Sequence, residues 1–113
     1  MNPRKEELRL RDIHLSLIAI FKIRNLLIKY PSEELLTIVA GDAINYQLIV
    51  LGEAITGLSY EYKDKHPEID WREIVNLRNH LAHQYFQVDA DSIETMIEER
   101  LRDLFQLVNL IFE

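Results

Sequence analysis

Apolar residues recur at three- and four-residue steps along most of this 113-residue chain, which is the spacing of one face of an α-helix. This pattern predicts helices over about 3–29, 33–58 and 71–85, and a last helix from about 91 onward. No segment shows sustained two-residue alternation, so we expect no β-sheet. Short connections between long helices favour antiparallel neighbours. The sequence therefore predicts one domain, residues 1–113, that is all-α and forms an antiparallel four- to five-helix up-and-down bundle.

The same stripes predict the core. The first helix carries Leu10, Ile13, Leu17, Ile20, Arg24 and Leu27 on one face, the second Ile44, Leu48, Leu51, Ile55 and Leu58, and the last Ile93, Ile97, Leu101, Leu104, Val108 and Ile111. Additional apolar residues widen the stripe of the first helix, namely Leu15, Ile18, Phe21, Ile23 and Ile28. So wide a stripe indicates burial against more than one neighbour, with a second subunit as one candidate.

Residues suited to helix N-termini stand between these segments. Ser32 is placed to cap the second helix. The polar stretch SYEYKDKHPEID, residues 59–70, reads as a connection that ends at Asp70. Asp70 and Glu73 are spaced as in a capping box, with aspartate in the usual place of serine or threonine. The third helix is therefore expected to begin directly after Asp70.

Composition narrows the class of protein. The chain has no cysteine, which excludes disulfides, thiolate metal sites and a cysteine nucleophile. Its N-terminus, MNPRKEELRLRDIH, lacks the hydrophobic region of a signal peptide, and no apolar run approaches the roughly 18–20 residues that span a bilayer. These features favour a cytoplasmic protein without a membrane segment. The net charge of −6 argues against a broad basic surface for duplex nucleic acid.

The charge is unevenly distributed. Residues 1–30 hold seven Lys or Arg and three Asp or Glu, whereas residues 31–113 hold six and sixteen. A basic first helix beside an acidic body could serve subunit pairing, partner docking or a local anion site, and a solvated charged face is the simpler interpretation.

The stretch LRNHLAHQYF, residues 77–86, is the part of the chain that is densest in groups able to do chemistry. On an ideal helix, Arg78 lies at the centre of the apolar face, within about 40° of Trp71, Ala82 and Tyr85. Burying an unpaired guanidinium costs several kcal/mol, so this arginine must find a carboxylate, line a cleft or await an anion.

The two histidines of this stretch separate on the helical wheel. Asn79 and His83 lie about 100° and 140° from Arg78, together at one edge of the apolar face. His80, at about 200°, points away from it and is most simply a solvent-facing residue. The amide of Asn79, one turn before His83, could hold that imidazole by a hydrogen bond.

Three interpretations of the stretch follow from these positions. Arg78 could form an internal ion pair with Glu53 or Asp42 of the second helix. A metal site is a weaker alternative, because His80 and His83 diverge and no third ligand is near them in the sequence. The third is acid–base catalysis, in which His83 moves a proton while Arg78 stabilises charge on a phosphodiester, so that a ribose 2′-hydroxyl attacks the adjacent phosphate without a metal.

RNHLAH, from Arg78 to His83, matches the R-x4–6-H motif of the HEPN superfamily. With Tyr85 the motif becomes R-x4-H-x-Y, which resembles the HepT-like branch. Further segments fall in that family's order and spacing: LRLRDI near the N-terminus, LIVLGEAI (48–55), HPEIDWREI (66–74) and NHLAHQYFQVD (79–89). The resemblance departs at Asn76-Leu77, where the family often has a Gly-Met or similar pair.

The resemblance implies an all-α bundle of HEPN type that forms a homodimer with a composite active-site cleft. It implies a metal-independent endoribonuclease that acts on RNA without a cofactor, as the toxin of a type VII HepT/MntA-like toxin–antitoxin system. Carried onto this chain, the catalytic pair is Arg78 and His83, Asn79 supports it, and no residue is a metal ligand.

The resemblance also implies a partner and an off-switch. The partner is an MntA-like nucleotidyltransferase antitoxin, which transfers AMP onto the motif tyrosine, here Tyr85. AMP would add bulk and negative charge on the stripe of Arg78 and compete with RNA phosphate. The alternative function is a non-catalytic substrate- or nucleotide-binding subunit of a minimal nucleotidyltransferase.

Overall fold

The computed structural model describes residues 3–84, 95 and 97–112, apart from the side chains of residues 3, 4, 77, 78 and 80–84. The elements in chain order are α1 (Pro3–Lys29), α2 (Glu34–Thr56), α3 (Tyr60–Asp64), α4 (Trp71–Gln84), a π-helical turn η2 (Ile97–Leu101) and α6 (Arg102–Phe112). The described residues contain no strand. The predicted all-α class is confirmed, and the first three long helices begin and end within two residues of their predicted limits.

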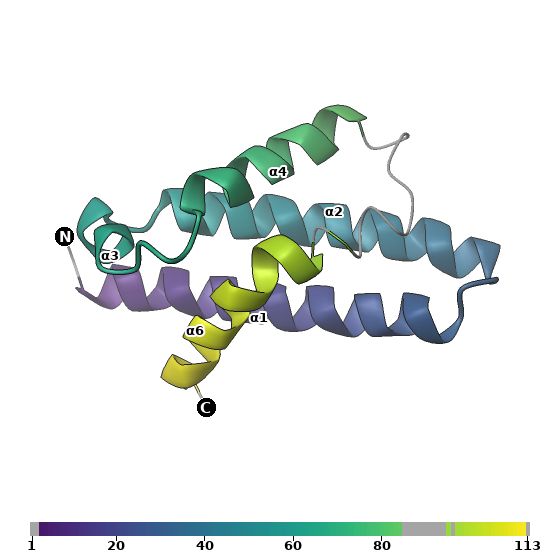
Figure 1. The fold of residues 1–113 in the computed structure, drawn as a ribbon, viewed down its shortest axis with the longest axis horizontal. Coiled ribbons are helices and arrows are strands. Elements are labelled where there is room, and N and C mark those ends of the chain that lie inside the picture. The colour runs from purple at the N-terminus through teal and green to yellow at the C-terminus, as the bar shows by residue number, and fades with distance from the viewer. Residues whose placement is uncertain (1–2, 85–94, 96, 113) are drawn as a thin grey trace.

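The helices pack as an up-and-down bundle (Figure 1). The longest two, α1 and α2, form an antiparallel hairpin. α4 lies along α2, while α6 crosses α1 obliquely and η2 contacts α4. The connection that contains α3 joins α2 to α4 and lies beside the N-terminal end of α1. This arrangement confirms the predicted architecture.

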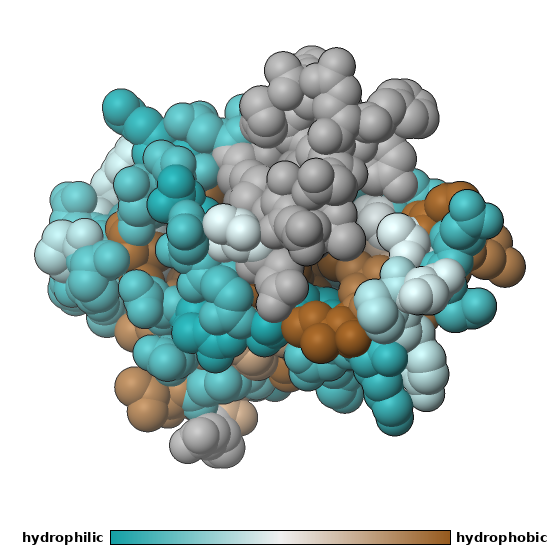
Figure 2. Space-filling model, turned by 45° about the vertical axis from the view of Figure 1, so that its right-hand side comes forward, coloured by the Kyte–Doolittle hydropathy of each residue, from teal (hydrophilic) through white to brown (hydrophobic). Residues whose placement is uncertain are grey.

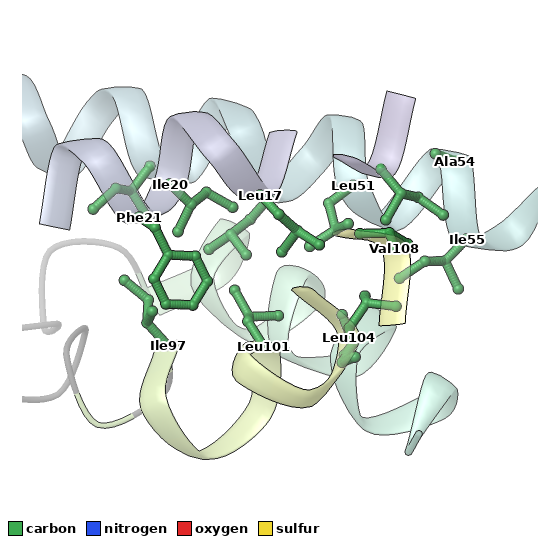
Figure 3. Close-up of a cluster of buried hydrophobic side chains, with 14 of the residues drawn as sticks. Leu17, Ile20, Phe21, Leu51, Ala54, Ile55, Ile97, Leu101, Leu104 and Val108 are labelled. Carbon is green, nitrogen blue, oxygen red and sulfur yellow. The ribbon is translucent and has the colours of Figure 1, made fainter. Parts of the chain in front are cut away.

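The core lies where α1, α2, α4, η2 and α6 meet, and Figure 3 shows part of it. Its largest members, all less than 2% exposed, are Ile13, Leu17, Ile20, Ile44, Leu51, Ile55, Ile74, Ile97, Leu101, Leu104 and Val108. Figure 3 shows Leu17 and Ile20 of α1 directed toward Leu101 and Leu104. The predicted inner face of the second helix is buried throughout, because its apolar residues recur at the helical period.

Arg24, the charged member of the predicted α1 stripe, is partly buried and forms an ion pair. Its Nη1 lies 2.6 Å from Oε1 of Glu98, and Oε2 of the same carboxylate accepts a hydrogen bond from Nε of Arg102 at 2.8 Å. The hydrogen bond from Arg102 and the nearby charge of Arg24 hold the pKa of Glu98 below its usual range. Both guanidinium groups lie 5.4 Å from the ring centroid of Phe21. These contacts join α1 to the last two elements at the edge of the core.

Three local predictions are wrong. The residue that caps α2 is Glu33, not Ser32, and it forms no side-chain cap hydrogen bond. Ile111 is 45% exposed rather than buried, because the end of α6 packs Phe112, and not Ile111, against His14 and Arg11 of α1. The polar connection contains the short helix α3, which Ser59 initiates by accepting a hydrogen bond from Tyr62 N.

α2 is also more apolar than the sequence interpretation allowed. Its 23 residues include an 18-residue window of mean hydropathy 1.5, so by length and composition this helix could cross a membrane. The expectation that no run approaches that length is therefore corrected. A helix through the core of a bundle meets the same criterion, and Ile44, Leu48, Leu51 and Ile55 of α2 are core residues here.

The surface carries apolar side chains beside the expected polar ones. Figure 2 shows brown apolar areas interrupting the teal polar surface on one side of the molecule. The exposed apolar residues of the two long helices are Leu8, Leu15, Leu26 and Ile28 on α1 and Leu35, Ile38, Val39 and Tyr46 on α2. The wide apolar stripe predicted for the first helix is thus only partly covered by the other described elements of the same chain.

Candidate functional site

The corner between α2 and α4 is held by a carboxylate of α1. Glu6 accepts two hydrogen bonds from Ser59, one from the backbone N–H at 2.8 Å and one from the hydroxyl at 2.7 Å. The same hydroxyl accepts the N–H of Tyr62 at 3.0 Å, which completes the first turn of α3. One carboxylate therefore determines where α3 sits on the bundle.

The start of α4 is determined by polar contacts with the segment that joins α3 to it. Oδ1 of Asp70 accepts the backbone N–H of Glu73 at 3.0 Å, which confirms the predicted aspartate cap. The indole N–H of Trp71 is shared between the carbonyl oxygens of Lys63 and His66, each at 3.2 Å. The carboxylate of Glu73 lies 3.2 Å from Nη2 of Arg100 rather than completing a capping box. These bonds position the first turn of α4 relative to α3 and η2.

The predicted catalytic residues follow on the same helix. α4 continues from Trp71 to Gln84, so the backbones of Arg78 and His83 both belong to it. Asn79 is exposed. The side chains of Arg78 and His83 lie outside the described residues, as does Tyr85. Their roles, and the pairing of Arg78 with Glu53 or Asp42, remain predictions.

Asn79 borders a cavity between α2 and α4. The cavity has a volume of about 300 Å³, and its walls also include Gly52, Glu53, Thr56 and Val75. Gly52 is buried on α2 and has no side chain, which leaves room for the cavity at this point. Glu53, Thr56 and Asn79 are the polar residues of its lining, which therefore includes both acceptors and donors of hydrogen bonds.

A second cavity, of about 430 Å³, lies beside the first. It is lined by Ile55, Thr56, Tyr60, Lys63, Trp71, Arg72, Val75 and Asn76, from α2, α3 and α4. Sequence reasoning missed this cavity because it treated residues 59–70 as a polar connection. The signal was present as tyrosines interleaved with lysines in SYEYKDK, a composition typical of surfaces that stack on bases and contact phosphates.

Two of the histidines are engaged elsewhere. Nε2 of His14 lies 2.8 Å from Oδ1 of Asn109, and its ring stacks on Phe112 with centroids 5.3 Å apart. Nδ1 of His66 lies 3.3 Å from Oε1 of Glu68. Within the described ranges, no group of three or more His, Asp or Glu side chains is placed to hold a metal ion.

Tyr62 packs beneath the second cavity and has a perturbed acidity. Its ring contacts Trp71 edge-on with centroids 6.2 Å apart, and that of His66 at 4.7 Å. Burial, followed by the charges of Glu6 and Glu68, raises the pKa of the Tyr62 phenol. Its hydroxyl is buried without a hydrogen-bond partner among the described residues. Tyr62 therefore supports the wall of the cavity and stays neutral at physiological pH.

The fold and the site define an all-α bundle in which an R-x4-H motif helix lies along a groove next to α2. The model of the ribonuclease HepT-like family matches residues 16–111, which include most of the bundle and the whole motif. The chain belongs to this family.

Individual relatives show the same likeness over shorter segments. A candidate RNase of Caldanaerobacter subterraneus is 40% identical over 53 residues, which cover 46% of this chain and 47% of the relative. A probable ribonuclease HepT of Thermococcus cleftensis is 36% identical over 62 residues, 55% of this chain and 56% of the relative. The chain thus spans about half the length of these curated relatives. No solved structure was found to match it.

Proposed function

We propose that the protein is an endoribonuclease that cleaves RNA without a metal ion or cofactor and acts in the cytoplasm as the toxin of a HepT/MntA-like toxin–antitoxin system. The observation that carries the proposal is membership of the ribonuclease HepT-like family over residues 16–111, a range that contains the R-x4-H-x-Y motif. The relatives named above as ribonucleases support the same reaction class.

In the proposed mechanism, Arg78 and His83 act on one phosphodiester. His83 removes the proton of the ribose 2′-hydroxyl, and the oxygen attacks the adjacent phosphorus as the 5′-oxygen leaves. Arg78 donates hydrogen bonds to the non-bridging oxygens, where negative charge develops. Asn79 orients the imidazole or the substrate. In a homodimer, the histidine of the second subunit can supply the proton that the leaving oxygen requires.

A homodimer with a composite cleft is part of the proposal. Exposed apolar residues on α1 and α2 support it, including Leu35 at 71% exposure and Ile38 at 59%, because a monomer of this size gains nothing from leaving them in water. Sedimentation velocity of the purified protein is expected to give a dimer. Ile38→Glu should shift the population toward monomer, and a wild-type monomer would contradict this element of the proposal.

The proposed partner is an MntA-like nucleotidyltransferase that inactivates the toxin by attaching AMP to Tyr85. Intact-mass measurement after co-expression with such an enzyme is expected to show the addition of one or more AMP groups. The Tyr85→Phe variant should lack the first of these additions. Unchanged mass in the presence of active enzyme and ATP would contradict this step.

The ribonuclease assay tests the central claim. Purified, unmodified protein should cleave single-stranded RNA in EDTA, and Arg78→Ala and His83→Ala should each lower the rate by about 10²–10⁴-fold. His80→Ala is the matched control, because it removes an imidazole that the helical wheel places away from the site. Full activity in either motif variant would overturn the mechanism. Stable partner binding without any cleavage would favour the alternative, a non-catalytic binding subunit of a nucleotidyltransferase.

A further inference from the structure

The two cavities between α2 and α4 form one groove. Both have Thr56 and Val75 in their walls, so the end bordered by Asn79 is continuous with the end bordered by Tyr60 and Arg72. We call this the α2–α4 groove. It runs from α3 along the motif helix toward the second half of α4.

The end of the groove near α3 offers aromatic surface. Tyr60 is 82% exposed, an unusual value for a tyrosine in a well-packed corner, and it lines the groove together with Trp71. The indole N–H of Trp71 is already donated to backbone carbonyls, so its ring is what remains available to a ligand. Stacking on such rings is the sequence-tolerant way in which proteins hold unpaired bases.

The same end is positively charged. Lys63 and Arg72 line it, and no acidic side chain of the described residues does. The ammonium of Lys63 lies 5.1 Å from the Tyr60 ring centroid and donates one hydrogen bond, of 3.4 Å, to the carbonyl of Ile55. Two of its three donors remain for a ligand. A chain of net charge −6 thus concentrates two cations beside two aromatic rings.

The opposite end differs in charge. Besides Thr56, which both ends share, its polar residues are Glu53 and Asn79, and a carboxylate repels phosphate but accepts hydrogen bonds from ribose hydroxyls and base amines. A ligand that suits both ends carries phosphate near Lys63 and Arg72 and sugar or base near Glu53. Single-stranded RNA has this alternation.

The groove is in register with the motif. The positions of Arg72, Asn76, Asn79 and His83 fall in one row of α4, within about 60° of one another on an ideal helix. Along the helix axis, Arg72 precedes Arg78, which lies about 120° away from this row, by about 9 Å and His83, which lies in it, by about 16 Å. These distances correspond to about three to five stacked nucleotides at 3.4 Å each. RNA held at Arg72 would therefore reach the motif within a few nucleotides.

We propose that the α2–α4 groove is a substrate-positioning subsite for single-stranded RNA. Tyr60 and Trp71 hold one base, Lys63 and Arg72 hold its phosphate, and the strand continues along α4 to the scissile bond about three to five nucleotides away. This inference rests on the proposed ribonuclease function. It adds to that function a structural feature that sets the distance between the nucleotide bound in the groove and the bond that is cut.

The first experiment measures binding apart from cleavage. A fluorescein-labelled, unstructured RNA of ten nucleotides is titrated with the His83→Ala protein, and anisotropy gives the Kd. Adding Tyr60→Ala should weaken binding about five- to a hundredfold, and adding Arg72→Ala about three- to thirtyfold with a shallower salt dependence. Arg72→Lys should restore part of the affinity.

Matched controls come from the same elements. Tyr46→Ala removes an exposed tyrosine of α2 that lies outside the groove, and Lys65→Ala removes an exposed lysine next to α3 that pairs with Glu61 at 3.5 Å. Both should leave the Kd within about twofold. All four substituted side chains are at least partly exposed, so we expect the bundle to stay intact in each variant. Thermal unfolding of each variant checks this expectation.

The second experiment uses substrate length. With RNAs that extend several nucleotides on either side of the cut, Tyr60→Ala and Arg72→Ala should raise KM more than they lower kcat. With a dinucleotide substrate, which cannot reach the groove, both variants should equal the wild type. Equal effects on long and short substrates would overturn the subsite.

The outcomes distinguish this inference from the proposed function. Loss of affinity in the groove variants of a protein that does not cleave RNA would support the subsite and overturn the catalysis. Cleavage by the wild type with unchanged Kd and KM in the groove variants would overturn the subsite and support the catalysis. Wild-type protein that neither binds nor cleaves the RNA would overturn both.

Discussion

The middle of the bundle and the corner around α3 are held together by different forces. In the middle, Leu51, Leu101 and Leu104 are completely buried among other apolar side chains (Figure 3). At the corner, hydrogen bonds from Ser59 to Glu6 and from Trp71 to two carbonyl oxygens do the positioning. Packing has no direction and brings helices together, whereas hydrogen bonds hold particular side chains in particular places.

This difference bears on function. The apolar middle decides which helices are neighbours and would serve many bundles of this size. The polar corner places Tyr60, Trp71 and Arg72 in the wall of the α2–α4 groove. We therefore expect substitutions in the middle to affect mainly the stability of the fold. Substitutions at the corner should affect RNA binding more than they affect stability.

The largest expected effect tests the middle. Leu51→Ala should lower the free energy of unfolding by about 2–5 kcal/mol, because it removes buried methyl groups and leaves a cavity at a fully enclosed position. Leu35→Ala is the control on the same helix, since Leu35 is 71% exposed and its substitution should cost less than about 0.5 kcal/mol. Urea denaturation measures both. Similar losses in the two variants would contradict the assigned core.

The next effect tests the link between α1 and α3. Glu6→Ala should lower the free energy of unfolding by about 1.5–3 kcal/mol, because two donors of Ser59 lose a charged acceptor. Glu7→Ala is the control, since that carboxylate is exposed and approaches Arg11 only to 3.8 Å. Hydrogen exchange of α3 should increase in the Glu6 variant alone. Unchanged exchange there would mean that α3 is held by packing.

A smaller effect tests the start of the motif helix. Asp70→Ala should lower the free energy of unfolding by about 0.5–2 kcal/mol through loss of the cap bond to Glu73 N. Asp70→Asn, whose amide oxygen can accept the same bond, should retain most of it. Thermal unfolding separates the two variants, and equal losses would indicate that charge rather than capping matters at this position.

The smallest effect concerns Tyr62. Tyr62→Phe should change the free energy of unfolding at pH 7 by less than about 1 kcal/mol, because the hydroxyl has no partner among the described residues. The raised pKa favours the neutral phenol in the folded state. Wild-type stability should therefore fall as pH rises above the unfolded value of about 10 toward the folded value.

The pH dependence distinguishes this buried phenol from exposed ones. Tyr62→Phe should unfold at a higher pH than the wild type, whereas the control Tyr46→Phe, at an exposed position, should follow the wild type. Denaturation midpoints between pH 8 and 11 measure the difference. Parallel curves for all three proteins would contradict burial of the phenol.

Much of the fold was predictable from the sequence, and the exceptions have physical reasons. The three long helices and the buried stripe of α2 follow from a period that each segment carries by itself. α3 escaped prediction because five residues are too short for a periodic signal, and its start depends on Glu6, which is 53 residues away from Ser59. Ile111 continues its stripe, yet it is 45% exposed, because Phe112 is the residue that packs on α1 at this end of α6.

The candidate site divides in the same way. The sequence by itself determined the helical class, the core faces, the aspartate cap of α4 and the R-x4-H-x-Y motif, because these are patterns within single segments. Only the tertiary structure decided that Tyr60, Lys63 and Arg72 share a groove with Asn79. Those residues come from two helices, α3 and α4, and their placement beside α2 depends on long-range hydrogen bonds and helix packing that no local period encodes.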